Sequence, residues 1–229
     1  MTGEESQRTP TWPRTHSETQ ETGMDARAQD LSDQLVAKWT SAQGVETTTA
    51  GAVVVNGLLR YGPLGPETAG ELLGWPSERV IERFREMNFA LETDDRGLIV
   101  GAGVSLDAGR PHTMELQGRL VHGWCAMDVL MFPLVLKEER SAVASRCQAG
   151  GGAVTLTVTP DGVRDVVPAE AAVTLAPATG GDIREVFCDR VNFYASPALA
   201  KEATARDPDL AACTVEEAWA VGKRLAGLF

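Results

Sequence analysis

Apolar residues recur at helical spacing through the first third of the chain, after a polar N-terminal segment. Residues 1–24 contain too few apolar side chains to offset the entropy lost on ordering, so we expect a disordered tail there. The Thr- and Gly-rich stretch 43–51 is typical of a loop. Apolar stripes bounded by proline and glycine predict four helices around it, over 25–40, 53–61, 66–73 and 76–87.

Alternating apolar and polar residues, which are typical of β-strands, dominate from residue 90 onward. A hairpin is expected over 90–106, with its turn at 94–97. The last three of these helices, followed by the hairpin, have the layout of a winged helix. More strands are expected over 113–121, 141–146, 153–159, 163–167, 171–175 and 183–195, before a last helix that begins at Thr214.

The predicted fold class is therefore α+β, with two domains after the tail. Residues 25–110 are expected to form a winged-helix-like N-terminal module of three helices. Residues 111–229 are expected to form a mixed or antiparallel β-sheet domain with flanking helices. The chain of 229 residues is long enough for one large domain or two small domains with proper cores.

A winged helix most often binds DNA, but the charge of this chain argues against that function. The formal net charge is −11 at pH 7, and residues 50–110 hold six arginines against nine acidic residues. Such a surface repels phosphate, so no nucleic-acid partner is expected. No membrane partner is expected either, because no apolar run approaches the roughly 20 residues that cross a bilayer. The N-terminus lacks the basic-then-apolar pattern of a signal peptide, which predicts a cytoplasmic protein.

The candidate chemistry lies in the apolar stretch 122–133, where Cys125 comes three residues before Asp128. Residues three apart share one face of a helix, so the thiol and the carboxyl group would be neighbours. A carboxylate among Trp, Met and Phe side chains is costly to bury in its ionised form, which raises its pKa and suits it to act as a general acid. Pro133 is expected to end or bend this helix. Plain core packing by the cysteine and capping by the aspartate fit the same residues.

The four cysteines, Cys125, Cys147, Cys188 and Cys213, are scattered, and no two have the C-x-x-C spacing of a zinc site. In a reducing cytosol they are expected to remain thiols. On the strand expected over 183–195, Cys188 falls on the more polar face, where it would line a cavity or remain an ordinary strand thiol. The three histidines are too few and too scattered for a histidine-based metal site.

Three blocks of the sequence resemble the organomercurial (alkylmercury) lyase family. The first runs from Gly123 to Pro133 (GWCAMDVLMFP) and resembles the family signature W-C-A-x-D-x-L-x-F-P. The second joins residues 144–147 (ASRC) to 154–160 (VTLTVTP), and the third runs from Val186 to Ser196 (VFCDRVNFYAS). The blocks follow one another in the family order, and the resemblance extends from about residue 25 to the end of the sequence.

The resemblance implies an enzyme that cleaves carbon–mercury bonds by protonating the carbon. Cys125 and Cys188 correspond to its two catalytic thiols and Asp128 to its catalytic acid and base, and these three residues would also hold the Hg(II) product. Cys147 corresponds to a cysteine that is structural in the family. Cys213 has no family role that we can assign.

The family needs no organic cofactor, only an external thiol to strip Hg(II) from the site or a mercuric reductase to accept it. Asp189 stands where some members carry a third cysteine, which puts auxiliary mercury capture in doubt. Two alternatives stay open on the sequence. One is a thiol protein that sequesters metal without catalysis, and the other is a relative recruited to another carbon–heteroatom cleavage. The residues fix neither the preference for alkyl or aryl mercurials nor the oligomeric state.

Overall fold

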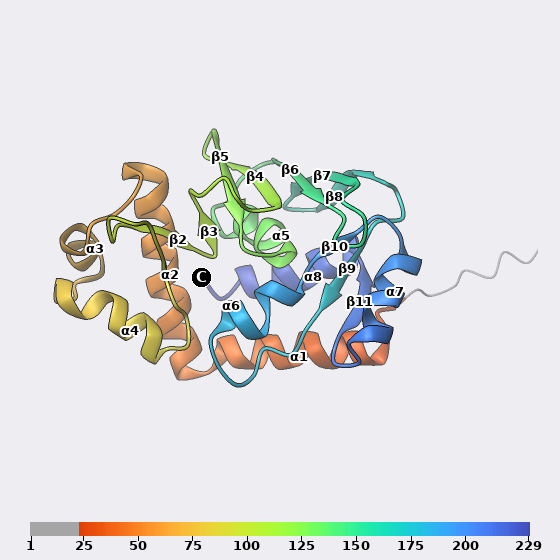
Figure 1. Cartoon of the computed structure of the whole chain (residues 1–229), viewed down its shortest axis with the longest axis horizontal. Helices are drawn as coiled ribbons and strands as arrows, with labels where there is room; N and C mark the ends of the chain where they lie inside the picture. The colour runs from red at the N-terminus through yellow and green to blue at the C-terminus, as the bar shows by residue number, and fades with distance from the viewer. Residues whose placement is uncertain (1–22) are drawn as a thin grey trace, which may run out of the picture.

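A computed structural model describes residues 23–229, so the tail expected over 1–24 lies almost wholly outside the described residues. Helix α1 (Ala26–Thr40) runs along one side of the molecule, and α2 (Ala42–Tyr61) stands across its end (Figure 1). Beyond α2, at one end of the molecule, lie α3 (Pro66–Leu73), the 3-10 turn η1 (Ser77–Arg79) and α4 (Val80–Glu86).

Helix α2 is longer than the sequence pattern indicates, and the loop expected over 43–51 is wrong. Ser41 caps the helix, because its side-chain oxygen accepts a hydrogen bond from the backbone N–H of Gly44. Small residues of this stretch, among them Thr47 and Gly51, are buried in the protein. Tertiary burial therefore overrides the low helix propensity of threonine and glycine.

Eight strands form one antiparallel sheet, and its order is β1–β2–β3–β5–β4–β6–β7–β8. Their bounds are β1 (Glu92–Thr93), β2 (Ile99–Ala102), β3 (Val104–Ser105), β4 (His112–Leu116), β5 (Arg119–Gly123), β6 (Ser141–Arg146), β7 (Ala153–Thr159) and β8 (Gly162–Val167). A second antiparallel sheet has the order β10–β9–β11, with β9 (Ala172–Leu175), β10 (Phe193–Tyr194) and β11 (Ala211–Thr214). The predicted α+β class is confirmed.

The alternation in the sequence explains the faces of β6 and β7. Val143 and Leu156 lie opposite each other in register and are buried, whereas the neighbouring pair Ala144 and Thr155 is exposed. One face of the sheet therefore belongs to the core, where α5 (Ala126–Val135) packs on β4, β5 and β7.

The strand expected over 183–195 is wrong. This stretch forms the short helix α6 (Ile183–Val186) and the 3-10 turn η2 (Cys188–Arg190), and only its end joins a sheet as β10. Asp182 caps α6 by accepting a hydrogen bond of 3.0 Å from the N–H of Arg184, so the chain turns from the start of the segment. The argument that assigned Cys188 to a strand face therefore does not hold.

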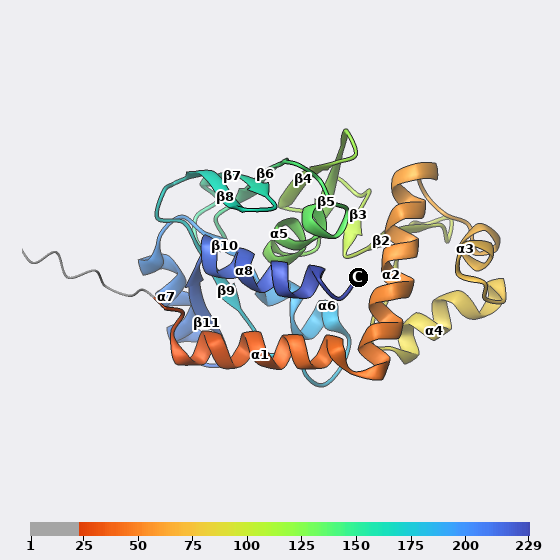
Figure 2. The ribbon, with the colours of Figure 1, turned by 180° about the vertical axis from the view of Figure 1, so that it is seen from behind.

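Two packed helices form the centre of the molecule. Helix α5 is buried along almost its whole length, and α8 (Val215–Ala226) lies between it and α1 (Figure 2). Gly222 of α8 lies against the backbone of α5, where a Cβ would be in ordinary van der Waals contact at 3.5 Å from Leu130. Pro133 does not end α5, which continues to Val135. Helix α7 (Pro197–Arg206) packs against the second sheet.

Contacts cross the domain division expected at residue 110. Strand β3, before the division, pairs with β5, after it. Helix α1 packs against β9, β11 and α8, and Arg119 donates a hydrogen bond to the carbonyl of Leu59 in α2. The winged-helix assignment and the boundary at residue 110 stay predictions. Within residues 23–229, no helix is long and apolar enough to cross a membrane.

The capping box of α8 is a measurable part of the stability of this core. Thr214 Oγ1 accepts a hydrogen bond of 3.1 Å from the N–H of Glu217, and Glu217 Oε2 accepts one of 2.8 Å from the N–H of Thr214. Thr214→Ala should lower the free energy of unfolding by about 1 kcal/mol in urea titrations, because a helix N–H loses its acceptor. Thr214→Ser is the matched control and should stay near the wild-type value. Equal stability of the Ala variant and the wild type would contradict this role.

Candidate active site

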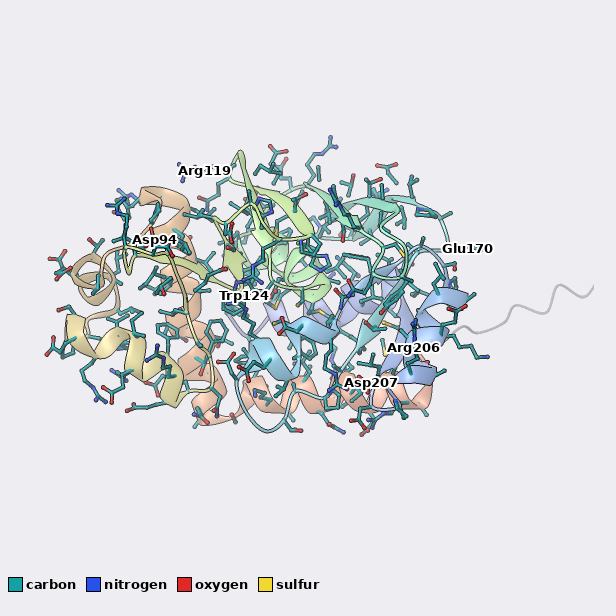
Figure 3. The ribbon with its side chains drawn as sticks, in the orientation of Figure 1. Asp94, Arg119, Trp124, Glu170, Arg206 and Asp207 are labelled. Carbon is teal, nitrogen blue, oxygen red and sulfur yellow. The ribbon has the colours of Figure 1, made fainter. Side chains whose placement is uncertain are left out.

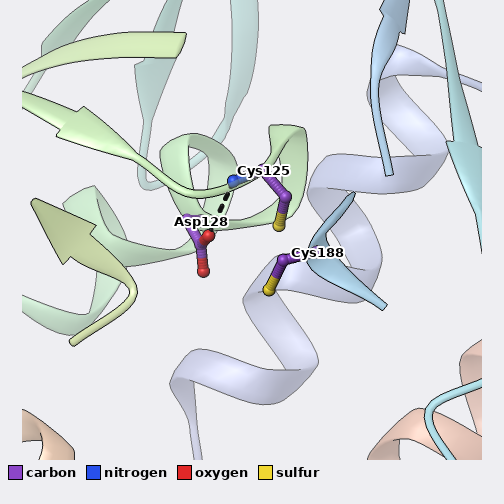
Figure 4. A group of neighbouring side chains, drawn as sticks. All are labelled: Cys125, Asp128 and Cys188. Atoms are coloured by element: carbon purple, nitrogen blue, oxygen red, sulfur yellow. Dashed lines mark hydrogen bonds between the residues drawn. The ribbon is translucent and has the colours of Figure 1, made fainter. Parts of the chain in front are cut away.

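The amino end of α5 brings a thiol and a carboxyl group together. Cys125 is the N-cap residue and Asp128 the third residue of the helix, and the two form a capping box. The N–H of Cys125 donates a hydrogen bond of 2.9 Å to Asp128 Oδ2 (Figure 4). The contact predicted from the spacing of three residues is present, although Cys125 lies at the end of the helix and not within it.

A second thiol arrives from the segment after α6. The first N–H of α5, on Ala126, donates a hydrogen bond of 2.9 Å to the carbonyl of Val191. The N–H of Val191 in turn donates to the carbonyl of Cys188, so this pairing fixes η2 against the start of α5. One ligand atom from each of Cys125, Asp128 and Cys188 lies within 4.8 Å of the others. Figure 4 shows the side chains of Cys125, Asp128 and Cys188 grouped at the start of α5.

Burial controls the ionisation of the carboxyl group. Asp128 is 7% exposed, and this desolvation raises its pKa to about 7. The hydrogen bonds from Cys125 and the positive charge of Arg110 act in the opposite direction and limit the rise. Near neutral pH the group therefore exists in both protonation states, which suits a residue that both accepts and donates a proton.

The two thiols are held in their neutral form. Cys125 is 0% exposed, and burial, followed by its contacts with Cys188 and Asp128, raises its pKa well above the ordinary value. For Cys188 the hydrogen bond with Cys125 lowers the pKa, but burial and the nearby carboxylates of Asp128, Asp189 and Asp182 outweigh it and the net shift is upward. Binding of a metal to either sulfur must therefore displace a proton.

A cavity of about 60 Å³ borders Asp128 and Cys188. Its wall is mainly apolar and comes from distant parts of the chain. Helices α1 and α2 supply Leu35, Trp39 and Thr47, and other walls come from α5, α6 and the segment after α8. The cavity can therefore receive a small apolar group next to the carboxyl group and one of the thiols.

Comparison with known proteins assigns the chain to a family. The family model described as alkylmercury lyase matches residues 107–227. The chain belongs to this family. An alkylmercury lyase of Pseudomonas putida is 37% identical over 182 residues, which is 79% of this chain and 84% of that protein. An alkylmercury lyase of Streptomyces lividans is 32% identical over 206 residues, or 88% of this chain and 94% of that protein. The resemblance read from the three sequence blocks is confirmed.

A solved structure described as the mercury-bound form of MerB2 has a similar fold. Its TM-score is 0.68, and the likeness covers 87% of this chain and 97% of that one, at 18% identity. The alkylmercury lyase match begins at residue 107 and includes all three clustered residues. The cavity walls from α1 and α2 precede the part of the chain that the family model matches.

The other two cysteines, Cys147 and Cys213, lie outside the cluster of Cys125, Asp128 and Cys188. The Cys147 sulfur accepts a hydrogen bond of 3.3 Å from the N–H of Ala195, and the Cys213 thiol donates one of 3.6 Å to the carbonyl of Val173. Both are buried. Each thus has a contact within the fold that explains its position.

The sequence did not predict the hydrogen bond and the ion pair that join Trp124, Glu92 and Arg110 beside the site. The indole N–H of Trp124 donates a hydrogen bond of 3.0 Å to Glu92 Oε2, and Arg110 forms an ion pair with the other oxygen of Glu92. Trp124, labelled in Figure 3, lies where the N-terminal helices meet the sheet, and its ring packs 5.5 Å from that of Phe89. Glu92 and Arg110 entered the sequence argument only as charges, because no local pattern connects them to Trp124.

Asp128 should make the protein less stable as the pH rises. An ordinary aspartate has a pKa of 3.8, against about 7 here, so between these values the folded protein keeps a proton that the unfolded chain has lost. The contribution of the Asp128 proton to the free energy of unfolding is complete below the pKa of the unfolded chain, 3.8, and is lost as the pH rises through the pKa of the folded protein, about 7. Relative to wild type, the free energy of unfolding of Asp128→Asn should rise by about 2.5 kcal/mol between pH 5 and pH 8, in urea titrations. A difference that does not change with pH would contradict the raised pKa.

Gly103 should tolerate no side chain. Its φ is +80°, and a Cβ there would lie 2.8 Å from the Phe132 ring and 3.4 Å from Asp128 Oδ1. Gly103→Ala should lower the free energy of unfolding by at least about 1 kcal/mol, because it adds backbone strain and displaces the ring beside the carboxyl group. Gly97→Ala offers a matched control: its φ is +75°, but a Cβ there meets nothing within 4 Å. An equal loss in both variants would show that only backbone strain matters.

Proposed function

We propose that the protein cleaves the carbon–mercury bond of an organomercurial, releasing the hydrocarbon and retaining Hg(II). The observation that supports this most is the group of two thiols and one carboxyl, with ligand atoms within 4.8 Å of one another beside an apolar cavity. Thiolates are the softest side-chain ligands and therefore suit a soft metal such as mercury. A protein that only held mercury would need the thiols but not the buried carboxyl group.

The first step is exchange at a thiol. Cys188 borders the cavity, whereas Cys125 is completely buried, so an organomercury–thiol complex meets Cys188 first. The Cys188 sulfur replaces the external thiolate on mercury, and its proton leaves with the released thiol. The Cys125 sulfur then binds mercury as well and gives its proton to the Asp128 carboxylate. The pKa of about 7 lets Asp128 accept that proton near neutral pH.

The second step is proton transfer to carbon. Two thiolates increase the electron density on mercury and on the carbon bonded to it, and the low dielectric of a buried site strengthens this effect. Protonated Asp128 donates its proton to that carbon while the carbon–mercury bond breaks, and the bonding electron pair stays with the carbon. Hydrocarbon leaves, and Hg(II) remains on Cys125 and Cys188 beside the Asp128 carboxylate. No organic cofactor enters these steps.

Turnover then requires removal of Hg(II). External thiols exchange for the two protein thiolates one at a time, returning a proton to each sulfur. Alternatively, the ion is transferred directly to a mercuric reductase, which then acts as the acceptor. In both cases mercury is a substrate and product of the protein and not a resident cofactor.

Hydrocarbon release is the decisive test. Purified protein with methylmercury or phenylmercury in excess thiol should release methane or benzene, measured by headspace gas chromatography. Cys125→Ser, Cys188→Ser and Asp128→Asn should each reduce the rate by about 100-fold or more, because each removes a mercury ligand or the proton carrier. Cys213→Ser, which changes a buried thiol outside the cluster, is the matched control and should keep the rate. Mercury bound by the wild type without hydrocarbon would favour sequestration.

A further inference from the structure

One wall of the cavity differs from the rest in its exposure. Within residues 23–229, the side chains that line the cavity are buried or half-buried except for Phe229, which is 41% exposed. Phe229 is the last residue of the sequence and follows the end of α8. Both views of the ribbon show this end of the chain beside α2 and α6 (Figures 1 and 2). The Phe229 ring therefore lies between the cavity and the solvent.

Two phenylalanine rings connect the carboxyl group to that outer wall. Phe132 lies one helical turn after Asp128 on α5, so the two side chains share a face. Gly103 packs against both side chains, because a Cβ at this position would lie 2.8 Å from the Phe132 ring and 3.4 Å from Asp128 Oδ1. The rings of Phe132 and Phe229 are 6.3 Å apart in an edge-to-face arrangement. A group that extends outward from Asp128 along Phe132 therefore reaches Phe229.

Phe229 is less buried than the other walls of the cavity. Its N–H donates a hydrogen bond of 3.4 Å to the carbonyl of Ala226, which is longer than a typical backbone bond. Phe132 and Phe187, by contrast, are each 4% exposed and belong to the core. A change at Phe229 can therefore alter the outer end of the cavity without opening the core.

We propose that Phe229 determines the size of the organic group that the site accepts, by closing the cavity over small groups and excluding fused aromatic ones. This inference rests on the proposed function, with mercury on Cys188 and its organic group directed along Phe132 toward Phe229. The preference for small mercurials thus comes from an exposed ring at the end of the chain. The mercury-binding residues themselves do not set it.

The first experiment compares kcat/KM for a fused aromatic mercurial, 1-naphthylmercury, with kcat/KM for methylmercury. Phe229→Ala should raise the naphthyl-to-methyl ratio by about tenfold or more, because pocket space for added carbon atoms changes discrimination on this scale. Phe229→Trp should lower the ratio. Leu228→Ala is the matched control: this neighbour packs on the core but does not line the cavity, so the ratio should stay at the wild-type value. An unchanged ratio in both Phe229 variants overturns the proposal.

The second experiment needs no catalysis. N-ethylmaleimide and the bulkier N-(1-pyrenyl)maleimide are reacted with each protein, and modification of Cys188 is followed by peptide mass spectrometry. Phe229→Ala should raise the pyrenyl-to-ethyl rate ratio at Cys188, and Leu228→Ala should not. A wild type that releases no hydrocarbon from any mercurial would defeat the proposed function, whereas the labelling ratio would still test Phe229. Equal labelling ratios in wild type and Phe229→Ala overturn its role as the outer wall.

Discussion

Burial of Asp128 at the amino end of α5 is the constraint on which the site depends. Desolvation favours the neutral acid, while the hydrogen bond from the Cys125 N–H and the positive end of the helix dipole favour the carboxylate. These opposing effects leave the pKa at about 7. In the proposed reaction, a more exposed aspartate would stay ionised and would not donate a proton to carbon. One deprived of the helix N–H groups would stay neutral and would not accept a proton from a thiol.

The local sequence pattern predicted the contact between Cys125 and Asp128, but it did not predict that Cys188 lies beside them. The spacing of three residues was enough to predict that Cys125 and Asp128 are neighbours, although the contact is made between the N-cap and the third residue of α5 and not within regular helix. Cys188 was connected to them only through the resemblance to the lyase family. Its place depends on the backbone hydrogen bond between Ala126 and Val191, a contact between distant segments that no local period encodes. The alternation around Cys188 indicated a strand, but the cap at Asp182 starts a helix instead.

The sequence did not predict the apolar walls of the cavity either, for a related reason. Thr47 lies in a stretch whose composition is typical of loops, yet burial against the rest of the protein makes it helical. Leu35 and Trp39 were assigned correctly to a helix, but the sequence gives no sign that this helix faces the thiols. Composition and periodicity describe single elements well. A site assembled from five or six elements depends on their packing, which only the folded chain defines.

The pairing of Cys125 with Cys188 has a consequence for the end of the reaction. In the proposed product complex, Hg(II) bound to both sulfurs is a covalent cross-link between the start of α5 and η2, and it closes the chain between them into a loop. Such a link stabilises the folded state in the same way as a disulfide bond or a structural metal. Release of Hg(II) from the proposed product complex is then a bond-exchange reaction and not a simple dissociation. In the proposed mechanism, this topology is the reason that Hg(II) leaves by exchange with an external thiol.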